Sequence, residues 1–261
     1  MAAGAPIWLA GLFGLVIGSF LNVCIFRLPR GVSVVTPPSR CTACGHLLSW
    51  YENIPLASFA VLRGRCRTCG VRISWQYPLI EVVTALVFAA AVMRFGVGML
   101  LLSRLTLACV LIVLFVVDLQ HRILPNAITL PGIVAGFVLN FFTEPGWLAS
   151  LLGIALGGGV LWGMFELWLL IRREEGLGFG DVKMLAMIGA FLGWKLTLLT
   201  LVLSSFAGSI VGIGMIATGK GTLKYALPFG TFLAIGALVA MFVGDSIVRW
   251  YLGFYSLMIV D

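Results

Sequence analysis

The sequence predicts an all-α polytopic membrane protein with about eight transmembrane helices and one small extramembrane domain. Of its 261 residues, 61% are hydrophobic and only 10% are charged, and the mean hydropathy is +1.11. Soluble domains carry about 25% charged residues. Apolar runs close to 20 residues long, the length that crosses a bilayer, recur along the chain. These observations exclude an ordinary soluble domain.

Eight apolar runs define the expected helices in chain order, and turn residues or charges separate them. The runs cover residues 7–26, 78–95, 98–117, 127–142, 147–171, 182–194, 196–217 and 225–248. The run 182–194 is short for a membrane span, because its length corresponds to a rise of only about 20 Å. We therefore expect its helix to begin earlier or to enter the membrane only part way, and an earlier start would place Asp181 at membrane depth.

The distribution of basic residues predicts the orientation. If the N-terminus is outside, 13 of the 17 Lys and Arg residues fall on one side, including the seven Arg of residues 27–76. Cytoplasmic loops retain Lys and Arg, so we expect this side to be cytoplasmic and both termini to be external. The same effect accounts for the net charge of +7, and no nucleic-acid partner is expected.

The expected organisation has three parts: a first transmembrane helix at residues 1–26, a cytoplasmic domain at 27–76 and a transmembrane core at 77–261. The first apolar run has no basic segment before it, so we interpret it as a retained helix and not as a cleaved signal peptide.

Two CxxC motifs in the 27–76 domain predict a structural zinc site. The candidate ligands are Cys41, Cys44, Cys66 and Cys69, and 21 residues separate the two motifs. Two such motifs can bring four thiolates into a tetrahedron, and a loop this small has too little core to fold well without metal. Disulfide or redox chemistry is the alternative, which a cytoplasmic location disfavours.

Two aspartates at helix ends are the candidate catalytic groups. Asp118 directly follows an apolar run, and Asp181 ends a Gly178-Phe-Gly180 segment at the start of another. Two complete crossings separate them, which returns the chain to the same face. Paired carboxyl groups suit amide hydrolysis, since one can act as a base while the other donates a proton. Gly178 and Gly180 would let an extended peptide approach. Helix capping and ion conduction remain open as alternatives.

Several motifs in order resemble the type IV prepilin leader peptidase/N-methyltransferases, a family of GxGD aspartic intramembrane proteases. The similar segments are Gly18-Ser-Phe-Leu-Asn-Val-Cys-Ile-Phe-Arg27, Pro38-Ser-Arg-Cys41-Thr-Ala-Cys44, Glu52-Asn-Ile-Pro55, Gly64-Arg-Cys66-Arg-Thr-Cys69, Tyr77-Pro-Leu-Ile-Glu81, Asp118-Leu-Gln-His-Arg-Ile-Leu-Pro-Asn126 and Gly178-Phe-Gly-Asp181-Val-Lys183.

The resemblance implies two activities. Asp118 and Asp181 would cleave the basic leader of type IV prepilins and type II secretion pseudopilins after a Gly, at the cytoplasmic face of the bacterial inner membrane. The enzyme would then methylate the new N-terminal residue, usually Phe, with S-adenosylmethionine as methyl donor. The cysteine domain would be associated with methyl transfer, but the residues of that reaction are not assigned. Some relatives without this domain only cleave, so a cleavage-only peptidase is the alternative.

A basic leader approaching a basic loop would need an acidic surface. Glu174 and Glu175 lie close in sequence to Asp181, and with Gly178, Gly180 and Lys183 they form the expected substrate approach. These glutamates could equally balance neighbouring arginines, because exposed ion pairs are common and weak. A membrane redox protein and a proton-linked transporter are the remaining alternatives from other functional classes.

Overall fold

The computed structural model describes residues 5–172, 178–219 and 227–258. It divides into two compact units, Met1–Leu101 and Leu102–Asp261. The described residues form helices, turns and two isolated bridges, and they contain no strand. The prediction of an all-α chain is confirmed for these residues.

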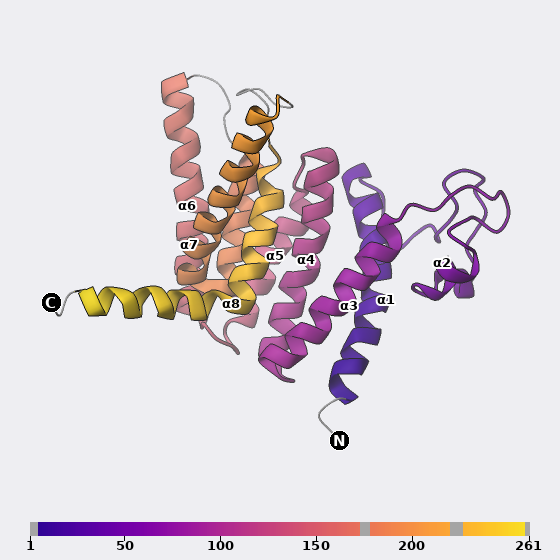
Figure 1. Cartoon of the computed structure of the whole chain (residues 1–261), viewed down its shortest axis with the longest axis horizontal. Helices are drawn as coiled ribbons and strands as arrows, with labels where there is room; N and C mark the ends of the chain where they lie inside the picture. The colour runs from indigo at the N-terminus through magenta and orange to yellow at the C-terminus, as the bar shows by residue number, and fades with distance from the viewer. Residues whose placement is uncertain (1–4, 173–177, 220–226, 259–261) are drawn as a thin grey trace. The chain divides into compact units, whose positions relative to one another are not determined.

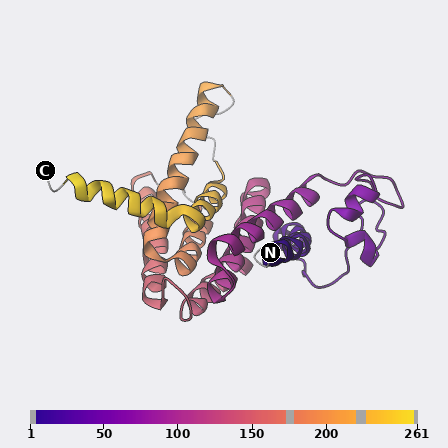
Figure 2. The ribbon, with the colours of Figure 1, turned by 60° about the horizontal axis from the view of Figure 1, so that its bottom comes forward.

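The first unit pairs two long helices, α1 (Ala5–Arg27) and α3 (Gln76–Phe95), which lie side by side in Figures 1 and 2. Glycines permit the close contact: a Cβ added at Gly14 or Gly18 would lie 2.7 Å from a Cα atom of α3. Between these helices the chain forms a lobe that contains the 3₁₀ helices η1 (Leu28–Arg30) and η2 (Trp50–Asn53) and the short helix α2 (Ala57–Val61). The lobe has little regular structure.

The second unit is a bundle in which α7 is central. It contains most of α4 (Met99–His121), then α5 (Asn126–Leu139), α6 (Trp147–Arg172), α7 (Phe179–Ala217) and α8 (Phe229–Met258). The helix α7 packs against α5, α6 and α8 (Figure 1). Contact with α6 is closest at Gly153 and Gly189, whose backbones meet, and a Cβ at Gly157 would lie 2.6 Å from the Leu185 carbonyl oxygen. Small residues allow helices to approach this closely in membranes.

Six helices of the described chain are long and apolar enough to cross a membrane, which identifies a multi-pass membrane protein. The predicted count of eight is not confirmed, for two reasons. The helix α5 has only 14 residues, and the runs 182–194 and 196–217 belong to the single 39-residue helix α7. As expected for the short run, its helix begins earlier, at Phe179.

The long helix α7 is interrupted at Gly193, whose φ of 73° and ψ of 171° are not helical. An interruption leaves carbonyl groups of the preceding turn without helical partners. Side chains from three other helices supply donors: Asn140 Nδ2 and Ser150 Oγ donate to the Ala190 carbonyl at 2.6 and 2.7 Å, and Arg104 Nη1 donates to the Phe191 carbonyl at 2.7 Å. The bundle therefore supplies donors to two of the carbonyls at the break, those of Ala190 and Phe191.

Candidate active site and metal centre

Asp118 lies near the end of α4, with only 4% of its surface exposed. Its Oδ2 accepts two hydrogen bonds from Thr231, one from the backbone N–H at 2.8 Å and one from the hydroxyl at 3.1 Å. Thr231 is in the first turn of α8, where backbone N–H groups have no partners within the helix. Asp118 therefore ties the end of α4 to the start of α8, and its side chain caps that helix.

Asp181 lies in the first turn of α7 and is also buried, with 8% of its surface exposed. The N-cap position of α7 belongs to Gly178, which is extended at φ −72° and ψ 127°. The Asp181 backbone N–H donates to the Gly178 carbonyl at 3.0 Å, and the Asp181 carboxyl group accepts from the Gly178 backbone N–H. The alternative that Asp181 is the N-cap of this helix is thus wrong.

The two aspartates converge around Leu124, in the segment between α4 and α5. A Cβ added at Gly180 would lie 3.0 Å from Leu124 Cβ, and one at Gly230 would lie 3.0 Å from both Leu124 Cδ1 and Asp118 Oδ2. The carboxyl groups of Asp118 and Asp181 are close enough to interact electrostatically. The ends of three helices, α4, α7 and α8, therefore meet at two buried carboxyl groups, as the sequence parity predicted.

The residues predicted to form the substrate approach are only partly brought together. A Cβ at Gly178 would lie 3.3 Å from Asp181 Oδ2, so this glycine leaves space beside the carboxyl group. The half-buried Lys183 is held by α5 instead: its Nζ donates to Asn126 Oδ1 at 2.8 Å and lies 4.7 Å from the centre of the Phe179 ring. Glu174 and Glu175 lie outside the described residues.

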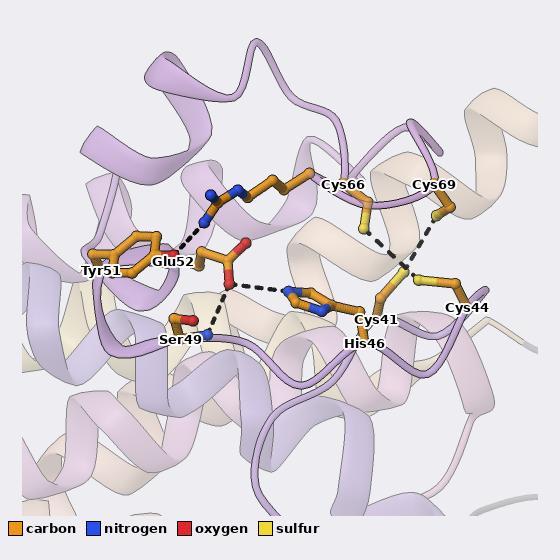
Figure 3. A network of polar contacts seen from close by, with 9 residues as sticks. Cys41, Cys44, His46, Ser49, Tyr51, Glu52, Cys66 and Cys69 are labelled. Atoms are coloured by element: carbon orange, nitrogen blue, oxygen red, sulfur yellow. Dashed lines mark hydrogen bonds and ion pairs between the residues drawn. The ribbon is translucent and has the colours of Figure 1, made fainter.

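The four cysteines predicted as ligands gather at one point in the lobe of the first unit (Figure 3). All four sulfur atoms lie within 4.8 Å of one another. Two of these separations join the two motifs: 3.9 Å from Cys41 Sγ to Cys69 Sγ and 4.0 Å from Cys44 Sγ to Cys66 Sγ. A tetrahedral zinc site with Zn–S bonds of about 2.3 Å requires sulfur separations of about 3.8 Å. The donor set therefore fits zinc.

The two motifs fold in the same way. Cys41 donates its N–H to the His46 carbonyl and Cys66 to the Val71 carbonyl, and each motif is followed by a glycine in the left-handed region, Gly45 and Gly70. Glycine adopts this conformation without strain. The backbone N–H groups of Cys44 and Ala43 lower the pKa of the Cys41 thiol to about 7. Each turn thus presents its thiols to the other motif.

A polar network lies beside the thiols and involves no predicted ligand. His46 Nε2 lies 3.2 Å from Glu52 Oε2, which also accepts the Ser49 N–H at 2.8 Å (Figure 3). The pKa of Glu52 is lowered, first because of the Ser49 hydrogen bond and then because of His46 and Arg67. His46 is therefore a neighbour that positions η2, and it is not one of the four clustered groups.

Sequence reasoning missed Thr231 and Leu124. Thr231 is 113 residues from Asp118 along the chain, and no spacing rule connects them. Pro228 and Gly230 indicate a helix start, but they do not indicate which carboxyl group that start meets. Leu124 is one apolar residue among many, and only its contacts with Gly180 and Gly230 distinguish it.

Comparison with known proteins gives consistent matches along the chain. Residues 12–95 match the bacterial peptidase A24 N-terminal domain, and residues 105–213 match the type IV leader peptidase family. A Pseudomonas putida protein named prepilin leader peptidase/N-methyltransferase is 38% identical over 92% of both chains. A protein of the same name from Aeromonas hydrophila is 39% identical over 97% of both chains. Another from Myxococcus xanthus is 46% identical over 82% of this chain and 65% of the relative. No solved structure matches.

Proposed function

This chain belongs to the type IV leader peptidase family, and from this premise we propose that it is an aspartic endopeptidase of type IV prepilins and type II secretion pseudopilins. It cleaves their basic leader after a Gly, at the cytoplasmic face of the bacterial inner membrane. The observation that carries the proposal is the convergence of the buried carboxyl groups of Asp118 and Asp181.

In the proposed reaction, one carboxylate takes a proton from water as the water oxygen attacks the scissile carbonyl. The other, protonated carboxyl group donates its proton to the carbonyl oxygen. Two nearby carboxyl groups divide the tasks in this way because like charges this close do not both ionise. We assign neither task permanently to one residue, since the pair titrates as a unit.

The surroundings of the dyad support an extended substrate. Thr231 holds Asp118 Oδ2 with two hydrogen bonds, which leaves Oδ1 to the reaction. Gly178 places no side chain beside the Asp181 carboxyl group, so a peptide backbone can approach there, whereas Gly180 packs against Leu124. We propose that Glu174 and Glu175, together with Lys183 at the edge of this approach, contact the leader; replacing both glutamates by Gln should raise the KM for a basic leader and weaken its salt dependence.

The second proposed activity is N-methylation of the newly exposed residue, with S-adenosylmethionine as methyl donor. The names of the relatives from Pseudomonas putida and Aeromonas hydrophila carry both activities, and these relatives match 92% and 97% of this chain. We place methyl transfer in the first unit and cleavage in the second, because the peptidase match begins only at residue 105.

We propose that the four clustered cysteines bind one structural zinc ion. A small lobe without strands has little core of its own, so the metal contributes directly to its folding. The close approach of sulfurs from different motifs supports a shared metal over a redox pair, which would join the two cysteines of one CxxC motif. The basic residues of this lobe support its placement in the cytoplasm.

One experiment tests both activities. The detergent-purified protein is incubated with a prepilin and labelled S-adenosylmethionine, and the N-terminus of the product is analysed by mass spectrometry. We expect loss of the leader and gain of one methyl group. Removal of the leader without the label would indicate a cleavage-only peptidase. An intact prepilin would contradict the proposed function, and proton-coupled uptake into vesicles would then favour a transporter.

A further inference from the structure

Glu81 is a buried carboxyl group that peptide cleavage does not use. It lies in the second turn of α3, with 7% of its surface exposed, in a helix apolar enough to span a membrane. Its Oε2 accepts the N–H of Leu56 at 2.9 Å, and Ser19 is its other hydrogen-bond partner. No Lys, Arg or His among the described residues pairs with it. An ionisable group at membrane depth is a functional candidate.

A buried acceptor without a donor lies at the same contact between α1 and α3. Asn22 has 2% of its surface exposed, and its Nδ2 donates to the Tyr77 carbonyl at 3.1 Å and to the Gly18 carbonyl at 3.3 Å, while its buried Oδ1 has no partner. The Tyr77 carbonyl is the helical acceptor of the Glu81 N–H, four residues later. A Cβ at Gly18 would lie 2.7 Å from Glu81 Cα. The two acceptors are thus within one turn of each other at the α1–α3 contact.

The backbone that reaches Glu81 is strained. Leu56 adopts φ 58° and ψ −45°, a region that residues with a side chain rarely occupy. Such a conformation persists only where the surroundings impose it, often at functional sites. Here the bend before α2 directs the Leu56 N–H to the Glu81 carboxyl group. This contact connects the lobe of the first unit to its helix pair.

We propose that Glu81 is the general base of methyl transfer and that Asn22 Oδ1 helps to hold the amine that is methylated. An ammonium group would give Glu81 the positive partner that no described Lys, Arg or His provides, and it would give Asn22 Oδ1 the donor that it lacks. Glu81 takes one proton from the ammonium, and the freed lone pair forms the N–C bond. The C–S bond of the methyl donor breaks as this bond forms, and its electron pair stays on sulfur. The proton then passes from Glu81 to water.

This assignment rests on the proposed methyltransferase activity, and the position of Glu81 favours it. Asn22, Leu56 and Glu81 all lie within the N-terminal match at residues 12–95, outside the peptidase match. Glu52 is the other buried carboxyl group of the first unit, and its Oε1 has no partner among the described residues. Its Oε2 already pairs with His46 and accepts the Ser49 N–H, whereas no described Lys, Arg or His pairs with Glu81.

The test uses Glu81→Gln in the full-length protein, because the amide keeps an oxygen for the Leu56 N–H but cannot take the proton. We expect methylation of a pre-cleaved pilin to fall by roughly 100-fold or more, the usual loss for a general base. Cleavage and zinc content should not change. Glu166→Gln, at an exposed position on α6, is the matched control and should leave both activities unchanged.

A binding measurement separates this role from a structural one. The parent protein should bind a mature pilin peptide with a free N-terminal amine more tightly than its N-acetylated form, and Glu81→Gln should lose this preference. Methylation within threefold of the parent, or loss of zinc, would overturn the proposal. So would a raised KM for leader cleavage, which would indicate that Glu81 binds a leader lysine. A parent that cleaves without methylating would overturn the second activity itself.

Discussion

At the scale of single residues, the two aspartates of the proposed dyad are held differently. Asp118 is fixed by side-chain and backbone donors from another helix, whereas the Asp181 carboxyl group is bonded locally, by the Gly178 backbone N–H at the start of α7. Its burial therefore depends on the glycines before it and on the packing of Leu124. This difference leads to two predictions.

Asp118→Asn and Asp181→Asn should each abolish cleavage, and the double variant should be scarcely worse than either single one. Residues that act as a unit have non-additive effects because removing one already stops the reaction. The measurement is kcat/KM for a prepilin peptide, and methylation of a pre-cleaved pilin should persist as the folding control. Cleavage by Asp118→Asn within about tenfold of the parent, a loss of only ~1.4 kcal/mol, would contradict the dyad.

Thr231→Val should lower kcat for cleavage by roughly tenfold or more, because a hydrogen bond to a charged group contributes about 1.5–3 kcal/mol. The KM should stay close to that of the parent, since Thr231 is expected to orient Asp118 without touching the leader. Thr231→Ser keeps the hydroxyl and should restore most of kcat. Thr218→Val, which removes an exposed hydroxyl bonded within α7, is the control. Equal rates for the Ser and Val variants would refute the role of the hydroxyl.

At the scale of elements, the interruption of α7 decides where Asp181 lies. The half-helix before Gly193 is almost entirely buried, and its last carbonyls are bound by Arg104 and Asn140. Arg104 and Asp118 belong to the same helix, α4. The hydrogen bond from Arg104 to the Phe191 carbonyl therefore gives α4 and α7, the helices that carry the two aspartates, a further contact. A cation is also favourable at the C-terminal end of a helix.

Arg104→Met should lower the melting temperature and the cleavage rate together, because it removes the shorter of two hydrogen bonds to the buried Phe191 carbonyl, which then keeps only Asn140 Nδ2 at 3.2 Å. The expected loss of stability is about 1.5–3 kcal/mol, the contribution of a hydrogen bond from a charged group. Thermal unfolding in detergent measures it. Lys195→Met removes a cation just after the break that is exposed and lies over Trp194, and it should change neither quantity. An unchanged melting temperature for Arg104→Met would show that the hydrogen bond from Arg104 to the Phe191 carbonyl does not stabilise the bundle.

At the scale of the whole molecule, the chain combines two compact units with separate matches and separate proposed chemistries. The first depends on a small lobe that has few regular elements, whereas the second is a helix bundle. We therefore expect the two activities to respond differently to loss of metal.

Removal of zinc with a strong chelator, or Cys41→Ser, should abolish methyl transfer and leave cleavage measurable. Metal analysis should give one zinc per chain for the parent and none for Cys41→Ser, since a site with three thiolates binds much more weakly. Cys24→Ser and Cys109→Ser, in the helices α1 and α4, should keep the full metal content. A parent that folds and methylates without zinc would disprove the structural role of the metal.

Much of the site could be predicted from the sequence because it depends on local spacing and on the direction of the chain. The CxxC spacing predicted that four thiols gather, and the parity of crossings predicted that Asp118 and Asp181 share a face. The count of eight spans was not confirmed, because hydropathy does not distinguish a full crossing from a 14-residue helix or from a helix interrupted at a glycine.

The sequence by itself determined the helical membrane class, the candidate zinc ligands and the two candidate carboxyl groups. Composition, hydrophobic periodicity and motif spacing can all be recognised within short stretches of the chain. Only the tertiary structure decided that Thr231 holds Asp118, that Leu124 separates two glycine-flanked helix starts, and that Asn22 lies beside Glu81. These contacts join residues distant in the sequence. They depend on how side chains of different helices pack, which no hydropathy pattern encodes.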